Sequence, residues 1–156
     1  MPVRTIALRH GGTADANTVD TLMAAAFDPR FGEAWTRNQC MGVLAMPGVR
    51  LTLASVDERP VGFALVRTVM DEAELLLLAV TPNARRTGVG GALLRAIIAE
   101  AEQAGVGRIF LEVRANNDAV SLYQQHGFTR QGVRPAYYRG RDGEQFDAHS
   151  YARPTN

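Results

Sequence analysis

Two arginines and a glycine-rich turn lie between a short apolar run, residues 75–80, and a segment whose apolar residues have helical spacing. They form the pattern Arg85-Arg86-x-Gly88-x-Gly90. The first N–H groups of a helix have no partner within the helix, and the helix dipole is positive there. Glycine has no side chain, so it leaves this backbone open to a ligand. The pattern therefore predicts a turn that binds an anion, most naturally a pyrophosphate, with positive charge fixed beside it.

Other glycine-rich turns place different demands on the residues around them. A phosphate-binding P-loop requires Lys followed by Ser or Thr after its glycines, and this turn has neither. A dinucleotide-binding turn requires a third glycine three residues after the second, where this chain has Leu93. On the turn alone, an ordinary strand-to-helix connection that binds nothing remains open.

Seven strands and four helices are predicted to position this turn, which places the chain in the α/β (α+β) class. The strands are expected at residues 3–10, 49–56, 61–71, 72–80, 108–114, 128–133 and 144–152. The helices are expected at residues 14–27 and 34–45, from the glycines to about 104, and at 119–126. Residues 49–80 should form an antiparallel meander. The strand at 108–114 should lie parallel to 75–80, because a helix separates the two. The sheet is therefore expected to be mixed and mostly antiparallel.

Two motifs, in this order along the chain, resemble the Gcn5-related N-acetyltransferase (GNAT) family. Arg85-x-x-Gly88-x-Gly90 is similar to the acetyl-CoA loop of that family, and Asn116-x-x-Ala119-x-x-Leu122-Tyr123-x-x-x-Gly127-Phe128 is similar to its closing motif. Residues 61–150 resemble the RimI-type enzymes, which acetylate the N-terminal alanine of a small-subunit ribosomal protein. That closer similarity lies in Asp71-Glu72-Ala73-Glu74, Leu78-Ala79-Val80, Leu111-Glu112-Val113-Arg114 and Tyr137-Tyr138. The stretch from Glu112 to Asn116 is one residue shorter than the usual family spacing.

The resemblance implies the acyl-CoA N-acyltransferase fold, with acetyl-CoA as cosubstrate and no metal. In that fold the parallel pair of strands splays apart, and exposed backbone N–H groups hold the acetyl carbonyl. The cosubstrate-binding residues implied are Leu78, Ala79, Val80, Arg85, Arg86, Thr87, Gly88, Val89, Gly90, Gly91, Asn116 and Ala119. Of these, residues 85–91 would receive the pyrophosphate, and Asn116 would reach the pantetheine or adenosine end.

The implied reaction is direct transfer of acetyl from the thioester to a primary amine. A free α-amine has a pKa of about 8, so a base must remove its proton before it attacks. Glu112 is the expected base, since a carboxyl among apolar strand neighbours should have a raised pKa. Tyr123 is the expected acid for the leaving thiolate. From the residues alone, Glu112 paired with Arg114 or facing water, and Tyr123 packed in the core, remain open. Glu72 and Glu74 are secondary candidates for the base.

Composition limits the other classes of function. A length of 156 residues fits one domain, residues 1–156. The chain has 17 basic and 16 acidic residues, so its net charge gives no reason to expect binding to nucleic acid or to a membrane. The single cysteine, Cys40, excludes an internal disulfide and a Cys-rich zinc site, and the three histidines lack metal-ligand spacing. No apolar run approaches a membrane span and no signal peptide is recognisable, so a cytoplasmic monomer or weak homodimer is expected.

The leading functional hypothesis is RimI-type acetylation of the N-terminal amine (alanine) of a ribosomal or other protein. The alternatives are an acetyltransferase for a small amine, a lysine side chain or an antibiotic, and a non-catalytic acetyl-CoA-binding domain. Phe31 and Trp35 are expected to pack in the core, with an acceptor groove as the alternative. Tyr137 and Tyr138 could contact a peptide acceptor or have a structural role.

Overall fold

Seven strands form one sheet in the computed structural model, which describes residues 5–155. Their order across the sheet is β1-β2-β3-β4-β5-β7-β6. Only β4 and β5 are parallel, and every other neighbouring pair is antiparallel. The predicted mixed sheet is therefore confirmed. The strands are β1 (Ile6–Gly11), β2 (Val49–Val56), β3 (Arg59–Val69), β4 (Glu72–Val80), β5 (Arg108–Arg114), β6 (Thr129–Arg139) and β7 (Gln145–Pro154).

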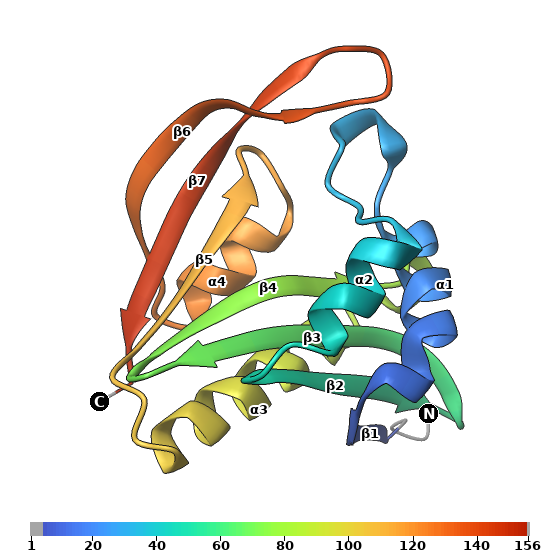
Figure 1. Cartoon of the computed structure of the whole chain (residues 1–156), viewed down its shortest axis with the longest axis vertical. Helices are drawn as coiled ribbons and strands as arrows, with labels where there is room; N and C mark the ends of the chain where they lie inside the picture. The colour runs from blue at the N-terminus through green and yellow to red at the C-terminus, as the bar shows by residue number, and fades with distance from the viewer. Residues whose placement is uncertain (1–4, 156) are drawn as a thin grey trace.

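Four α-helices cover the two faces of the sheet (Figure 1). The helices α1 (Ala16–Ala26) and α2 (Arg37–Leu44) lie on one face, and α3 (Val89–Gln103) and α4 (Ala119–Gln125) lie on the other. Short 3₁₀ turns are present at Thr13–Asp15, Pro29–Phe31 and Pro82–Ala84. Within residues 5–155, no helix has the length and hydrophobicity needed to cross a bilayer.

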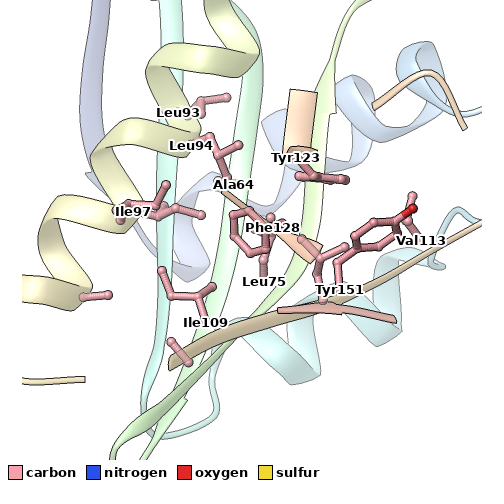
Figure 2. Packing of buried hydrophobic residues seen from close by; sticks show 14 of the residues in the cluster. Ala64, Leu75, Leu93, Leu94, Ile97, Ile109, Val113, Tyr123, Phe128 and Tyr151 are labelled. Atoms are coloured by element: carbon pink, nitrogen blue, oxygen red, sulfur yellow. The ribbon is translucent and has the colours of Figure 1, made fainter. Parts of the chain in front are cut away.

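Each face of the sheet carries its own apolar cluster. The α3/α4 cluster packs Leu93, Leu94 and Ile97 of α3 against the sheet and includes Tyr123 and Phe128 (Figure 2). The α1/α2 cluster contains Val19, Leu22 and Met23 of α1, Cys40 and Leu44 of α2, and Leu51, Leu53, Phe63, Leu65, Leu77 and Ala79 of the sheet. Burial of each large apolar side chain contributes about 1.5–3 kcal/mol, so both faces hold their helices firmly.

Several element boundaries differ from the predicted ones. The helix expected at 34–45 begins only at Arg37, because Thr36 and Gln39 form a reciprocal capping box (Gln39 N to Thr36 Oγ1, 3.1 Å; Thr36 N to Gln39 Oε1, 2.8 Å). The first strand is Ile6–Gly11, and positions 3 and 4 of the expected strand lie outside the described residues. The strand expected at 128–133 continues to Arg139 through an irregular pairing with β7.

Candidate active site

The two parallel strands at the centre of the sheet separate after a short paired stretch. Residues Glu72–Leu75 of β4 pair with Arg108–Leu111 of β5, and the ladder stops there. The register with β3 skips Leu76, so β4 has a bulge at this point. A bulge bends and twists its strand. Beyond it, β5 follows β7 as far as Arg114 while β4 stays with β3, so the implied splay is present (Figure 1).

Backbone groups of β4 open into the gap that this splay leaves. Peptide groups of a strand point alternately to its two edges. Thr81 N donates to Val61 O at 2.8 Å, on the β3 side. The backbone groups of Val80 and Leu78 must therefore point to the opposite edge, where β5 has left the ladder, while those of Ala79 point to β3. Consistent with this alternation, Val80 O accepts a hydrogen bond from Arg85 Nε at 3.2 Å.

A cleft of about 1150 Å³ runs through the splay and reaches both faces of the sheet. On the α3/α4 side it is lined by Arg86, Gly88, Gly90, Gly91, Asn116, Ala119 and Tyr123, and Arg85 lines it beside the end of β4. On the α1/α2 side it is lined by Phe31, Glu33, Trp35, Glu74, Glu112, Arg114, Tyr137 and Tyr138. One continuous space therefore connects the glycine turn to the two residues expected to catalyse the reaction.

The glycine turn forms the first turn of α3. Gly88 is the N-cap residue, with φ of +93°, and a Cβ placed there would meet only Ile6, at 3.8 Å. The first helical bond is Ala92 N to Gly88 O (3.0 Å), so the N–H groups of Gly90 and Gly91 have no acceptor within the helix. These bare amides line the cleft, as an anion site requires.

Two of the residues expected at the turn have side chains that do not line the cleft. Val89 is buried in the α3/α4 cluster, and the hydroxyl of Thr87 donates to Ala84 O. The two arginines also differ from one another. Arg85 Nη2 donates to Ala26 O at 2.6 Å, so its guanidinium ties the end of α1 to the end of β4. Arg86 is exposed at the cleft, and within residues 5–155 it forms no ion pair.

Glu112 lies on the α1/α2 side of the cleft. Its strand neighbours Leu111 and Val113 are buried in the α3/α4 cluster, so the glutamate points to the opposite face. Its Oε1 lies 3.1 Å from Arg134 Nη2, whereas Oε2 is buried and has no hydrogen-bond partner among the described residues. The pairing with Arg114 that the sequence left open is wrong, because Arg114 pairs with Glu33 instead (3.2 Å).

Tyr123 lies on the α3/α4 side of the same cleft. Only 5% of the residue is exposed, and its ring packs edge-on against Phe128 with centroids 5.9 Å apart (Figure 2). Burial, with Tyr138 and Glu33 nearby, raises the pKa of Tyr123, so the phenol keeps its proton. The helix α4 that carries it begins where Asn117 Oδ1 accepts a hydrogen bond from Ala119 N (2.8 Å).

The loop between α1 and α2 forms a wall of the site that sequence reasoning missed. Glu33 accepts hydrogen bonds from Arg114 Nε (3.2 Å) and Asn117 Nδ2 (2.9 Å), and Arg114 lies 3.7 Å from the centre of the Phe31 ring. Phe31 and Trp35 both line the cleft, although Trp35 also packs on the α1/α2 cluster. Nothing local marks Glu33 for this position, because its partners are more than 80 residues away in the chain.

The same loop contacts the tip of the β6–β7 hairpin. Arg141 N donates to Pro29 O at 3.1 Å, and the rings of Phe31 and Phe146 pack edge-on at 5.1 Å. A Cβ at Gly140 would lie 1.6 Å from Arg30 O, so only glycine allows this approach. We call the contact between residues 29–33 and 139–146 the clasp. In Figure 1 the loop after α1 lies beside the tip of the β6–β7 hairpin, and Phe31 and Glu33 of this loop line the α1/α2 side of the cleft.

Two further titratable groups, Glu74 and Tyr138, line the α1/α2 side of the cleft. Burial raises the pKa of Glu74, and the neighbouring charge of Glu112 raises it further. Burial also raises the pKa of Tyr138, with Glu33 as the next cause. From the sequence, Glu74 was a secondary candidate for the base, and Tyr138 could contact a peptide acceptor or have a structural role. Groups of this kind gather at functional sites more often than elsewhere.

Comparison with known proteins matches this architecture to one family. Residues 16–128 match the model of the acetyltransferase (GNAT) family. The chain is 44% identical over 84 residues to the [ribosomal protein bS18]-alanine N-acetyltransferase of Escherichia coli (strain K12), a match over 53% of this chain and 57% of that protein. It therefore spans little more than half the length of this curated relative. The crystal structure of the ribosomal-protein-S18-alanine N-acetyltransferase from Escherichia coli superposes with a TM-score of 0.87 and 30% identity, covering 97% of this chain and 95% of the other. Ard1 from Thermoplasma volcanium gives a TM-score of 0.80 at 25% identity, covering 96% and 97%.

Proposed function

Since the chain belongs to the GNAT family of acetyltransferases, we propose that it transfers acetyl from acetyl-CoA to the N-terminal amine of a protein. An alanine-starting ribosomal protein is the first acceptor to consider, because the curated relative in Escherichia coli is named for that activity. The observation that carries this proposal is the splay of β4 from β5. It opens one cleft between the bare amides of α3 and the side chains of Glu112 and Tyr123.

The α3/α4 side of the cleft suits acetyl-CoA. Unpaired amides at Gly90 and Gly91, at the positive end of a 15-residue helix, favour a pyrophosphate, and Arg86 adds charge at the rim. The open edge of β4 offers backbone groups to an extended, amide-containing chain, as a neighbouring strand would. The N–H of Leu78 or Val80 would then donate to the acetyl carbonyl and stabilise the negative charge that develops on its oxygen.

Glu112 and Tyr123 suit the two proton transfers, and they lie on opposite sides of the splay. Glu112 lies on the α1/α2 side, where the acceptor would bind, and we call this the acceptor side. Glu112 would take a proton from the acceptor's ammonium group, directly or through water. The freed nitrogen then attacks the thioester carbonyl, a C–N bond forms, the nitrogen gives up its second proton to water, and the C–S bond breaks. Tyr123, on the cosubstrate side, would give its proton to the departing thiolate. The raised pKa of Tyr123 keeps the phenol protonated in the free protein.

The experiment that tests this function is an acceptor screen read by mass spectrometry. The acceptors are a peptide beginning with Ala from a small-subunit ribosomal protein, the same peptide with a blocked N-terminus and an internal lysine, and a panel of small amines. Fragmentation should place the acetyl group on the N-terminal alanine. Acetylation of small amines alone would replace this proposal with the small-amine alternative. Tight acetyl-CoA binding without thiol release for any amine would leave the non-catalytic alternative.

A further inference from the structure

We infer that Glu74 forms, together with Glu112, the subsite that binds the acceptor's ammonium group, and that it thereby sets the affinity for the acceptor. This inference rests on the proposed function and deepens it. Glu112 alone would be enough to remove a proton. Glu74 would hold the charged amine beside Glu112 before that proton is transferred.

The sheet places both carboxylates on one face, at the point where the strands part. On β4, Ala73 and Leu75 are buried in the α3/α4 cluster, so Glu74 between them points to the acceptor side, as Glu112 does on β5. The parallel ladder ends at Leu75 opposite Leu111. Glu74 is therefore next to the last paired residue of its strand, and Glu112 is the first residue past the ladder on the neighbouring strand. Both side chains line the cleft.

Two arginines on nearby strands flank the two carboxylates, and each leaves carboxylate oxygens without a hydrogen bond. Arg67 pairs in register with Glu74 from β3, and Arg134 holds Glu112 Oε1 from the other side. Glu74 forms no hydrogen bond or ion pair within residues 5–155, and Glu112 Oε2 is buried without a partner. Within residues 5–155 Arg67 forms no ion pair with Glu74, and its Nε is buried without an acceptor, although its charge acts on Glu74 from the neighbouring strand. A primary ammonium carries one positive charge and three N–H donors, so it could donate hydrogen bonds to the unpartnered oxygens of both carboxylates.

The electrostatics of the free protein agree with a cation site. Burial raises the pKa of Glu74, and the charge of Glu112 raises it further, although Arg67 and Arg134 act in the opposite direction. Tyr138, whose pKa is raised mainly by burial, also lies near Glu112, as do Glu33 and Tyr137 on the same side of the cleft. A cation bound between the two carboxylates removes their repulsion, so the subsite should prefer the ammonium form of an acceptor to a neutral analogue of the same shape.

Glu72 provides a matched control on the same strand. It is two residues before Glu74 on the same side of β4, but its side chain is about half exposed (49%) and lies 3.6 Å from Arg108. It does not line the cleft. Replacing either glutamate with glutamine keeps the size of the side chain and removes one negative charge.

The test compares two peptides in the wild type, Glu74→Gln and Glu72→Gln. One peptide begins with alanine, and the other begins with a propionyl group that lacks the amine. Both are titrated in the presence of coenzyme A without its acetyl group, so that no transfer occurs. The wild type and Glu72→Gln should bind the amine peptide about tenfold or more tightly than the neutral one, and Glu74→Gln should lose most of that preference. Glu74→Gln should also raise the acceptor KM about tenfold while changing kcat less than Glu112→Gln does.

Two results would overturn this assignment. An unchanged preference in Glu74→Gln means that Glu112 alone binds the amine, even if the wild type acetylates the peptide as proposed. If Glu72→Gln loses as much of the preference for the amine peptide as Glu74→Gln does, the effect comes from the net charge of the protein and not from a specific subsite. Turnover of the wild type on the same alanine peptide is measured separately. Absence of that turnover, together with no preference for the amine, removes the proposed function and this inference together.

Discussion

Oε1 of Glu112 on β5 lies 3.1 Å from Nη2 of Arg134 on β6, and this pair fixes how the carboxylate faces the cleft. Arg134 is largely exposed and reaches Glu112 from the far side of β7, two strands away in the sheet. The pair occupies one carboxylate oxygen and leaves the other buried without a partner. Glu112 is therefore held in one orientation while it keeps an oxygen that can accept a proton.

Replacing Glu112 with glutamine should slow acetyl transfer at neutral pH by roughly 10²–10⁴-fold, the usual contribution of a general base. The loss should shrink as pH rises, because more of an amine with a pKa of about 8 is then already deprotonated. Initial rates from pH 6 to 10 on the preferred acceptor would measure this. Glu72→Gln serves as the control. A profile for Glu112→Gln that parallels the wild type at every pH would remove Glu112 as the base.

Replacing Tyr123 with phenylalanine should lower kcat about 10²-fold with little change in acetyl-CoA affinity. The ring contact with Phe128 is kept, so the melting temperature should barely move. Tyr151→Phe is a matched control, because Tyr151 is buried in the same cluster and does not line the cleft (Figure 2). Equal losses of kcat in the two variants would mean that Tyr123 acts through packing.

Replacing Gly88 with glutamate should weaken acetyl-CoA binding by placing a negative side chain where the pyrophosphate is proposed to lie. Its φ of +93° strains any other residue, so Gly88→Gln is needed as a control of the same size and strain. Calorimetric titration should give an affinity for Gly88→Glu about tenfold lower than for Gly88→Gln. Equal affinities in the two variants would mean that no phosphate lies close to this residue.

The parts of the structure that depend on nearby residues could be predicted from the sequence. The turn from β4 to α3 is encoded by an apolar run, two glycines and the helical spacing of Leu93, Leu94 and Ile97, all within about 25 residues. The same holds for the parallel placement of β5, because a helix separates it from β4. The splay was inferred from the family resemblance alone. Its physical signal, the bulge at Leu76, is visible only in the pairing register.

What the sequence did not predict depends on contacts between distant segments. Pairing of Glu112 with its neighbour Arg114 was left open as an alternative, but the hairpin brings Arg134 to Glu112, and Arg114 is bound by Glu33. The α1–α2 loop has no strong periodicity, so its position beside the hairpin tip could not be inferred. The late start of α2 is different, because the Thr36 and Gln39 capping box is a local signal that was overlooked.

The ion pair between Glu33 and Arg114 should contribute substantially to stability. About 10% of the Glu33 side chain and 11% of the Arg114 side chain are exposed, so loss of one partner leaves a buried charge unpaired. Glu33→Ala should lower the free energy of unfolding by about 3 kcal/mol in urea titrations. Glu144→Ala is the control in the same clasp: its pair with Arg30 spans 3.8 Å and is about half exposed, so the loss should be under about 1 kcal/mol. Similar losses in the two variants would mean that the Glu33 pair is solvated.

The raised pKa of Glu74 makes a prediction about stability that is independent of catalysis. Burial first, and the charge of Glu112 second, disfavour the ionised carboxylate in the folded protein relative to the unfolded chain. Ionisation of Glu74 therefore costs stability at every pH above its folded-state pKa, and the cost disappears below the unfolded-state pKa of about 4.3. Glu74→Gln should accordingly raise the melting temperature at pH 7–8, and the gain should vanish as the pH falls towards 4. Glu72→Gln, which removes an exposed partner of Arg108, should show no such gain. A melting temperature of Glu74→Gln at or below that of the wild type at pH 7 would mean that Glu74 is stabilised in its charged form.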